Sequence, residues 1–321
     1  MQVRDNHLAA SVRGKRALLV ASTGGHLAQL HRLVPALELS PDSTWVTFDH
    51  PQSRSLLAAE EVAYIPYIPP RGFREAAGAV GTARKLIREL RPEVVLSTGA
   101  AIAAPFLGVG AARGVPAYYL ESVSRFDGPS LTGRVLRRMP RVTTYTQHHG
   151  WAGRGWRPGP NVMAQFAAVA NPTAPVGPLN VFVTLGTIKP YRFDRLVDAI
   201  LDVAPNDVTL TWQLGETGRD DLPGVVNRLI DADSFDEAIS QADVVITHAG
   251  VGSALRILEL GKMPIMVPRD PAHGEHVDRH QFQVATFLDQ QGLGLLRTPD
   301  VLSIDDLIQA SENRVVGAGA P

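Results

Sequence analysis

Strand-length apolar runs that alternate with helix-length amphipathic segments constrain this chain more than any other feature. In the first half the runs are RALLVAS, STWVTFD, EVVLSTG and PAYYLES, and a helix-length segment follows each of the first three. Runs that are almost continuously apolar are typical of parallel strands covered by helices on both faces of the sheet. The first half is therefore predicted to be an open α/β domain.

The same alternation starts again in the second half. There the apolar runs are LNVFVTLGT, TLTWQLG, ADVVITHAG, MPIMVP and GLGLL. After the first of them, Phe193, Leu196, Val197, Ile200 and Leu201 recur at the spacing of one helix face. The sequence therefore predicts a second Rossmann-like domain.

The domain limits follow from the segments that lack periodicity. Pro and Gly cluster over residues 158–179, which is typical of a connection between domains, and we place the boundary near 172–178. Both chain ends are polar and aperiodic, so we expect a flexible leader and a flexible tail. The expected parts are a leader over 1–16, domains over 17–172 and 178–310, and a tail over 311–321.

Composition excludes several classes of function. The 321 residues include no cysteine, which removes disulfides, thiolate zinc sites and thiol nucleophiles and fits a reducing cytosol. Lys and Arg total 31 against 32 Asp and Glu, so the basic balance of a dedicated nucleic-acid binder is missing and we expect no nucleic-acid partner. No apolar run approaches 18 residues, and we expect no membrane crossing.

Three glycine-containing turns follow predicted strands and precede predicted helices. They are STGGH at 22–26, STGAA at 97–101 and THAGVGS at 247–253. Such turns place free N–H groups and the positive helix end where a phosphate binds, although each alone is a weak signal. The first turn lacks the G-x-G-x-x-G pattern, so a dehydrogenase with Asp49 on the ribose is a minor alternative. A Walker GK[ST] pattern is also absent, which argues against ATP or GTP hydrolysis.

Residues 247–285 resemble the donor-binding half of the glycosyltransferase family 28 group. Members of that group include the bacterial peptidoglycan enzyme MurG and the catalytic subunit of the eukaryotic dolichol-linked N-acetylglucosaminyltransferase. The matching pieces are HAG and GS after ADVVIT, GK before PIMVP, and DRHQ opening a helix. The segments GGHLAQLHRL, LSTGAAIAAPFLGVGAARGVPAYYLES and VANPT are similar to the companion membrane-recruiting subunit and the acceptor domain. The resemblance covers residues 17–292.

The resemblance implies a GT-B fold, with two facing Rossmann-like domains and a cleft between them. It implies an inverting glycosyltransferase with a UDP-sugar donor, no cofactor and no metal. The first domain would bind a polyprenyl-diphosphate-linked acceptor and face the membrane, and the second would bind the donor. Because GEHVDRHQ is similar to bacterial exopolysaccharide glycosyltransferases, we expect a role in exopolysaccharide or cell-surface glycan assembly. We expect a cytoplasmic protein in peripheral contact with the inner membrane.

The resemblance also implies donor-binding residues in the second half. They are Thr187, His248, Gly250, Gly252, Ser253, His280 and Gln281. The glycines and the serine would hold the diphosphate, and His280 and Gln281 would contact sugar hydroxyls. Asp278, in the same DRHQ string, is expected to order that turn as an N-cap. The segment 231–235 should face the nucleobase.

One position departs from the family pattern. Where the family usually has a glutamate that binds the ribose hydroxyls, this chain has Arg256, and Glu259 lies one helical turn further on. Either Glu259 replaces the usual contact from the same helix face, or Arg256 reaches the diphosphate or an acidic sugar.

The base that activates the acceptor is expected in the first half. His26 follows two glycines at a helix start, and Glu121 ends a strand where side chains point to the ligand crevice. The sequence does not rank the two. Gly24, Gly25, Thr98 and Gly99 are expected to contact the acceptor.

Other features have simpler interpretations. The DxD string at 231–233 and the pair His148-His149 are expected to bind no metal. The arginines of residues 131–141 form an amphipathic helix that is either an ordinary surface helix or a contact for anionic lipids. Two rival functions remain: a UDP-sugar 2-epimerase, which needs no acceptor region, and a non-catalytic nucleotide-sugar-binding protein without the base.

Overall fold

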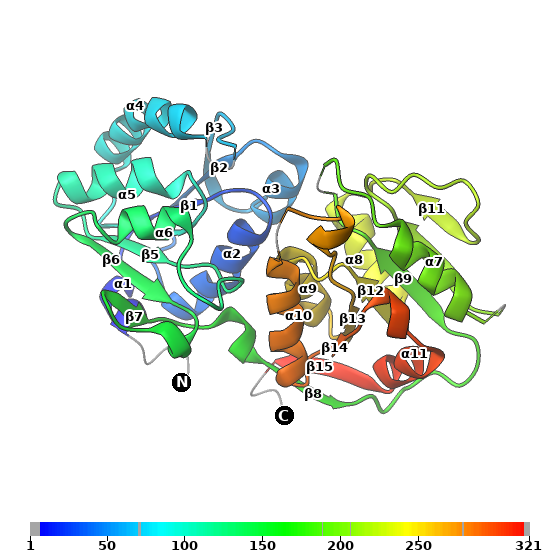
Figure 1. The fold of residues 1–321 in the computed structure, drawn as a ribbon. Helices are drawn as coiled ribbons and strands as arrows, with labels where there is room; N and C mark the ends of the chain where they lie inside the picture. Colours follow the sequence, from blue (N-terminus) through cyan, green and yellow to red (C-terminus); the bar gives the residue numbers. More distant parts are fainter. Residues whose placement is uncertain (1–6, 70–71, 188, 206, 278, 318–321) are drawn as a thin grey trace. The chain divides into compact units, whose positions relative to one another are not determined.

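The computed structural model describes residues 7–69, 72–187, 189–205, 207–277 and 279–317. The chain divides into two compact units, Met1–Val162 and Met163–Pro321. Each unit has its own parallel sheet with helices packed against it (Figure 1). Within the described residues, no helix combines the length and the apolar character needed to span a bilayer.

A seven-stranded parallel sheet forms the centre of the first unit, in the order β3-β2-β1-β4-β5-β6-β7. The strands are β1 (Ala17–Ala21), β2 (Thr44–Phe48), β3 (Glu61–Ile65), β4 (Val94–Gly99), β5 (Ala117–Leu120), β6 (Val142–Thr146) and β7 (Trp156–Pro158). Every residue of β1, β2 and β4 is buried, as the continuous apolar runs predict.

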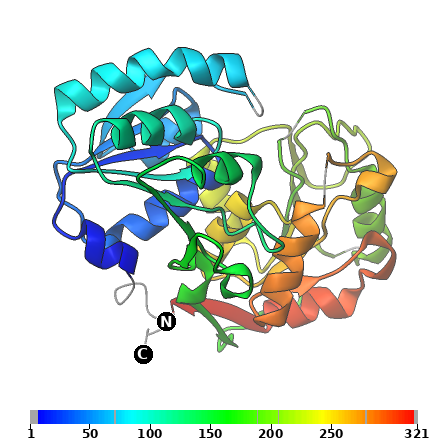
Figure 2. The same cartoon turned by 60° about the vertical axis from the view of Figure 1, so that its left-hand side comes forward.

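Helices cover both faces of this sheet. They are α1 (His7–Val12), α2 (Gly25–Leu37), α3 (Pro51–Leu56), α4 (Phe73–Leu90), α5 (Ala103–Ala112) and α6 (Leu131–Leu136), with a 3₁₀ turn η2 (His149–Trp151). Figure 2 shows α4 and α5 on one side of the strands and α1 and α2 on the other. On the α4–α5 side, Leu18 and Val20 of β1 belong to one buried cluster with Ala83 of α4 and Phe106 of α5.

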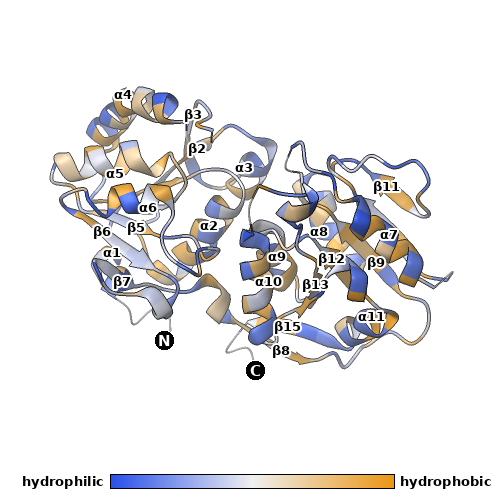
Figure 3. Cartoon of the chain, in the orientation of Figure 1, coloured by the Kyte–Doolittle hydropathy of each residue, from blue (hydrophilic) through white to orange (hydrophobic). Residues whose placement is uncertain are grey.

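The second unit repeats this architecture with six parallel strands, in the order β11-β10-β9-β12-β13-β14. The strands are β9 (Asn180–Thr184), β10 (Thr209–Gln213), β11 (Val225–Asn227), β12 (Val244–Thr247), β13 (Pro264–Met266) and β14 (Leu295–Leu296). The helices and 3₁₀ turns are η3 (Val162–Gln165), α7 (Asp194–Val203), α8 (Ala232–Gln241), α9 (Val251–Glu259), η4 (Pro271–His273), α10 (His280–Gln290), η5 (Pro299–Val301) and α11 (Ile304–Ser311). Figure 3 shows hydrophilic and hydrophobic residues alternating along α7, which buries Leu196, Val197 and Ile200.

In each sheet the strand order reverses once, between β1 and β4 in the first unit and between β9 and β12 in the second. In open α/β sheets, ligands bind outside the carboxyl ends of the strands at such a reversal, because the loops on either side lead to opposite faces. The turns 22–26 and 97–101 follow β1 and β4, and Leu185–Thr187 and 248–250 follow β9 and β12. The predicted site loops therefore lie at the two switch points.

Three domain predictions are corrected by the structure. Residues 7–12 of the expected leader form α1, in which Leu8, Ala9 and Val12 are buried. Residues 313–317 of the expected tail form β15 (Asn313–Gly317), which pairs antiparallel with β8 (Phe166–Ala170). Because β8 pairs with a strand of the second unit, the division falls after Val162 rather than near 172–178. A six-residue helix and a five-residue edge strand are too short to show a clear period.

Candidate functional site

Reciprocal hydrogen bonds join the two loops at the switch point of the first unit. His26 Nδ1 lies 2.7 Å from the Thr98 carbonyl oxygen, and Thr98 Oγ1 donates to the His26 carbonyl oxygen at 2.8 Å. A carbonyl oxygen can only accept, so Nδ1 carries the proton and Nε2 presents a lone pair. The imidazole is therefore oriented as a base is in a catalytic dyad.

The environment keeps this imidazole neutral. Burial lowers the pKa of His26 to about 4; the bond to Thr98 opposes the shift, and the positive charge of Arg125 adds to it. No motif in the sequence singles out Arg125, whose side chain forms no ion pair within the described residues. At neutral pH the first switch point thus combines an unprotonated imidazole with a nearby cation.

The glycines predicted to contact the acceptor surround His26. Gly24 is the N-cap of α2 and provides no side-chain cap, and α2 begins at Gly25. A Cβ on Gly99 would lie 3.0 Å from His26 Cε1 and from Nδ1, and Gly99 has a φ of 111°. A side chain at position 99 would press against the imidazole, so the close approach of β4 to His26 requires glycine.

The carboxylate of Glu121 is fully used by its neighbours. Its side chain is buried, and Oε1 accepts from the Tyr119 hydroxyl at 2.9 Å and from the Ser122 N–H at 3.1 Å. Oε2 accepts from the N–H and the hydroxyl of Ser130, both at 2.9 Å. A Cβ on Gly133 would lie 2.3 Å from Oε2, so no side chain fits there. Through these hydrogen bonds Glu121 fixes the conformation of the loop between β5 and α6.

The two candidates for the base therefore differ in what they can offer. His26 has a free lone pair, whereas both oxygens of Glu121 already accept two hydrogen bonds each. Burial and the Glu121 charge raise the pKa of Tyr119 well above its ordinary value, so the phenol stays a donor to this carboxylate. The geometry favours His26 as the base and a positioning role for Glu121.

His248 occupies the switch point of the second unit. Its Nδ1 lies 3.3 Å from the Thr184 carbonyl oxygen, so Nδ1 carries the proton and Nε2 the lone pair. A Cβ on Gly186 would lie 2.5 Å from Nε2, and one on Gly250 would lie 2.4 Å from it. Burial, reinforced by the charge of Arg269, lowers the pKa of His248 to about 3. A neutral imidazole therefore fills the space between two loops that must contain glycine.

The first turn of α9 is open to an anion. Its N-cap, Gly250, provides no side-chain hydrogen bond, and Gly252 and Ser253 lie in the first turn. The first N–H groups of a helix have no partner within the helix, and the positive end of the dipole points the same way. Ala249 has a left-handed φ of 60°, a strained conformation that turns the chain into α9. Thr187, in the loop after β9, is exposed.

The predicted sugar-binding pair lies at the start of α10. His280 is its first residue, and Gln281 is buried with Oε1 accepting from the Arg269 N–H at 2.9 Å. Asp278, which we expected to order this turn, lies outside the described residues. Gln281 therefore contacts the loop that follows β13, a link that the sequence did not reveal.

Arg256 does not project freely from α9. Its guanidinium binds both carboxylate oxygens of Asp236 in α8, with Nε 2.6 Å from Oδ1, and Nη1 donates to Glu259 Oε2 at 2.9 Å. Two carboxylates neutralise this arginine, so it has little charge left to offer an acidic sugar. The alternative in which Arg256 reaches an acidic sugar loses its support, and the three side chains instead join α8 to α9.

The segment 231–235 has structural partners of its own. The Asp231 side chain caps α8 by accepting from the Ser234 N–H at 2.8 Å, and Phe235 packs edge-on against Phe182, with the ring centroids 5.6 Å apart. Phe235 thus faces the core of the unit. Across the described part of the chain, no group of three or more His, Asp or Glu side chains is placed to hold a metal ion.

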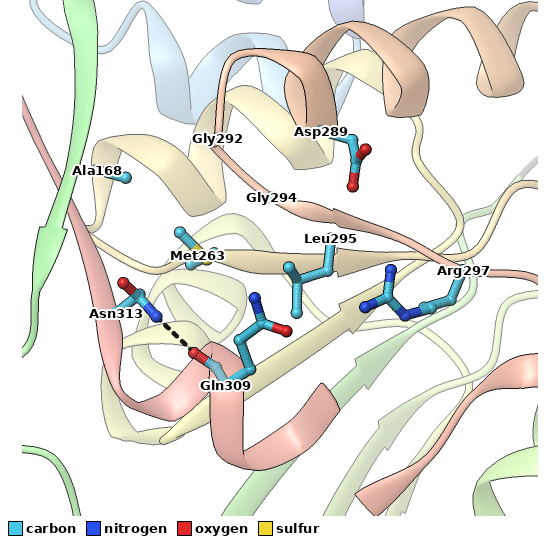
Figure 4. A pocket seen from close by; sticks show the side chains of 9 residues that line it. All are labelled: Ala168, Met263, Asp289, Gly292, Gly294, Leu295, Arg297, Gln309 and Asn313. Carbon is cyan, nitrogen blue, oxygen red and sulfur yellow. Dashed lines mark hydrogen bonds between the residues drawn. The ribbon is translucent and has the colours of Figure 1, made fainter. Parts of the chain in front are cut away.

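A hollow of 390 Å³ in the second unit lies away from the switch point (Figure 4). It is lined by Ala168, Met263, Asp289, Gly292, Gly294, Leu295, Arg297, Gln309 and Asn313. Met263 precedes β13 and Gly294 precedes β14, so much of the hollow borders the amino ends of these strands. Ligands of α/β sheets bind at the carboxyl ends, and we do not include this hollow in the candidate site.

Comparison with known proteins identifies the second unit. Residues 180–313 match the glycosyltransferase family 28 C-terminal domain. The chain is also similar to enzymes named UDP-N-acetylglucosamine–N-acetylmuramyl-(pentapeptide) pyrophosphoryl-undecaprenol N-acetylglucosamine transferase. For the one from a Polaromonas species, identity is 27%, over 95% of this chain and 86% of that protein. For the one from Christiangramia forsetii it is 23%, over 70% of this chain and 64% of that protein.

Solved structures show the same fold. MurG of Acinetobacter baumannii has a TM-score of 0.54 at 18% identity, covering 92% of this chain and 89% of that one. The UDP-GlcNAc 2-epimerase of Neisseria meningitidis has a TM-score of 0.55 at 10% identity, covering 92% and 97%. The two sheets and these likenesses confirm the predicted α/β GT-B fold. Taken with the family match over residues 180–313 and the sequence relatives, they support a MurG-like glycosyltransferase with a family 28 C-terminal domain.

Proposed function

We propose that this enzyme transfers a sugar from a UDP-sugar to a polyprenyl-diphosphate-linked acceptor, with inversion at the anomeric carbon. The observation that carries the proposal is the uncapped first turn of α9 in a family 28 domain. This turn contains Gly252 and Ser253, and its N-cap, Gly250, lies against the neutral His248. A diphosphate is the ligand that such a turn suits best. The names of the relatives specify a UDP-sugar donor and a pyrophosphoryl-undecaprenol acceptor.

His26 is the proposed base. Its Nε2 takes the proton from the acceptor hydroxyl while the hydroxyl oxygen bonds to the anomeric carbon and the bond from that carbon to the phosphate oxygen breaks. The leaving UDP carries the electron pair of that bond. Helix α9 stabilises the growing charge on the diphosphate through the N–H groups of its first turn. The Thr98 carbonyl keeps the imidazole in the tautomer that this step needs.

The roles of the remaining predicted residues belong to the same proposal. Thr187 would contact the diphosphate from the loop after β9, and His280 and the amide of Gln281 would contact the sugar hydroxyls. Glu259 is already engaged by Arg256, so a ribose contact from it would be shared with that ion pair. The donor is a substrate, and no further cofactor takes part.

The biological setting is also a proposal. Exposed Leu131 and Val135 lie on α6 beside Arg134, and Arg137, Arg138 and Arg141 follow in sequence, a mixture that suits an anionic lipid surface. A lipid-linked acceptor would place the enzyme on the cytoplasmic face of the membrane. The similarity of GEHVDRHQ to exopolysaccharide glycosyltransferases supports a role in exopolysaccharide or surface glycan assembly.

The main alternative is a UDP-sugar 2-epimerase, since a solved epimerase shares the fold at a comparable TM-score. An epimerase has no use for a base directed at an acceptor. The clamp between His26 and Thr98 in the first unit therefore favours the transferase.

Calorimetric titration with UDP, GDP and NAD tests the donor class. We expect UDP to bind, and Ser253→Trp to abolish binding because the indole would fill the first turn of α9. Binding of NAD without UDP would refute the proposal in favour of a dehydrogenase. Binding of UDP without any turnover of UDP-sugars in the presence of acceptor would favour a non-catalytic binding protein.

A further inference from the structure

Arg269 is a fully buried arginine at the second switch point. It follows β13, and its exposed fraction is 0%. Its N–H donates to Gln281 Oε1 at 2.9 Å, and its Nη2 donates to the carbonyl oxygen of Leu185. Arg269 therefore joins the start of α10 to the loop after β9.

Among the residues that the structure describes, none gives the charge of Arg269 a direct counter-charge. Its Nε and Nη1 are buried without a hydrogen-bond partner, and its Cζ lies 5.8 Å from the centroid of the Phe193 ring. Within the described residues, no carboxylate forms an ion pair with it. Glu275 acts on it from a distance but is shared with Arg195, at 3.5 Å, and with the Asp270 N–H, at 2.9 Å.

A buried charge without a counter-ion is costly, by several kcal/mol in proteins. Burial lowers the pKa of Arg269 to about 10, which still leaves the guanidinium protonated at pH 7. The cost of this isolated cation suggests that an anion completes the site in the working enzyme.

The field of this cation reaches the diphosphate site. The charge of Arg269 contributes to the lowered pKa of His248, whose Nε2 lies against Gly186 and Gly250. Gly250 is the N-cap of α9 and offers no side-chain hydrogen bond to the first turn of that helix. A buried cation and an open helix N-terminus therefore act on the same small region.

We propose that Arg269 positions the Leu185–Thr187 loop and supplies the buried positive charge that favours the diphosphate of a nucleoside diphosphate at the start of α9. It acts as a positioning residue, through the Leu185–Thr187 loop and through its charge, and it makes the site prefer a nucleoside diphosphate over the bare nucleoside. The inference rests on the proposed function, because it concerns the donor site of that reaction. In the reaction it would also stabilise the charge on the leaving UDP.

Calorimetric titration with UDP and with uridine tests this role in the full-length protein. Arg269→Met keeps the apolar stem and removes the charge, so we expect UDP affinity to fall about tenfold or more while uridine affinity stays within about twofold. Arg269→Lys should retain most of the preference for UDP. Glu275→Gln removes the only acidic group that acts on Arg269 among the described residues and should raise UDP affinity relative to uridine.

The outcomes separate this inference from the proposed function. If the wild type binds UDP more tightly than uridine and Arg269→Met leaves that ratio unchanged, Arg269 has no role in holding the diphosphate. If Arg269→Met does not fold, as judged by circular dichroism, Glu275→Gln decides: an unchanged ratio overturns the inference. A wild type that does not distinguish UDP from uridine would overturn the proposed donor site itself.

Discussion

Replacing Glu121 with glutamine distinguishes a positioning residue from a catalytic base. The carboxylate accepts four hydrogen bonds, two at each oxygen. An amide can accept at one end only, and its NH₂ group would face two donors at the other. If the oxygen stays with Tyr119 and Ser122, the N–H and hydroxyl of Ser130 lose their acceptor.

The expected loss of stability follows from this count. A buried donor left without an acceptor costs about 1–3 kcal/mol, so the two donors of Ser130 predict a destabilisation of about 2–6 kcal/mol, with the lower end favoured because Ser130 is partly exposed to water. With a urea slope of about 2 kcal/mol/M, the unfolding midpoint falls by about 1 M or more. Rotation of the Ser130 hydroxyl to a new acceptor would place the result at the lower end of this range.

Tryptophan fluorescence during urea unfolding measures this effect in the relevant unit. Trp45, Trp151 and Trp156 lie in the first unit, and Trp212 is in the second. Glu60→Gln is the matched control. Among the described residues, the exposed Glu60 side chain accepts a hydrogen bond only from Trp45 Nε1, and an amide oxygen can accept the same bond. An unchanged midpoint for Glu121→Gln, together with a large loss of turnover, would refute the positioning role and make Glu121 the base.

Four further predictions concern the histidines, the glycines and the arginines. His26→Gln should lower the transfer rate by about 10²–10⁴-fold without changing UDP affinity. Wild-type activity should stay level down to about pH 5, because the pKa of His26 is about 4. A loss of activity with a midpoint near pH 6.5 would contradict this role. Burial lowers the pKa of His26 and of His248, so below pH 6.5 the unfolded chain binds more protons than the folded one. The urea midpoint should therefore fall as pH decreases from 6.5 toward 4. A midpoint independent of pH would exclude neutral buried imidazoles. Gly250→Ala should abolish UDP binding, since its Cβ would lie 2.4 Å from His248 Nε2, whereas Gly218→Ala has open space and should bind normally. A variant with glutamine in place of Arg134, Arg137, Arg138 and Arg141 should no longer sediment with anionic vesicles. Each arginine near the surface contributes about 1 kcal/mol to membrane binding. Equal sedimentation of the variant and the wild type would contradict the membrane proposal.

The sheets and their site loops could be predicted from local pattern. Continuous apolar runs indicate buried parallel strands, and the glycines of GGH and HAGVGS mark the turns into α2 and α9, because both signals depend on neighbours in sequence. The structure then placed these turns at the points where the strand order reverses. The sequence alone could not give that order, which depends on pairings between distant strands.

Contacts between distant segments account for what the sequence left open. The sequence does not rank His26 and Glu121 as candidates for the base. In the structure His26 has a free lone pair, whereas the Glu121 carboxylate already accepts hydrogen bonds, among them one from Ser130, nine residues further on. The sequence leaves Arg256 and Glu259 as alternative donor contacts, because the partner of Arg256, Asp236, lies 20 residues earlier on another helix. Arg269 follows the ordinary apolar strand β13, and only its burial and its hydrogen bond to the Leu185 carbonyl oxygen set it apart.

An assay of the transfer reaction itself tests whether the enzyme moves a sugar from a UDP-sugar to a polyprenyl-diphosphate-linked acceptor. NMR would follow a panel of UDP-sugars with the enzyme, with and without a polyprenyl-diphosphate-linked sugar. We expect one donor to be consumed only when the acceptor is present, with UDP released in equal amount. The new linkage should have the anomeric configuration opposite to that of the donor. Interconversion of a UDP-sugar and its C2 epimer without acceptor, or no consumption of any donor, would contradict it.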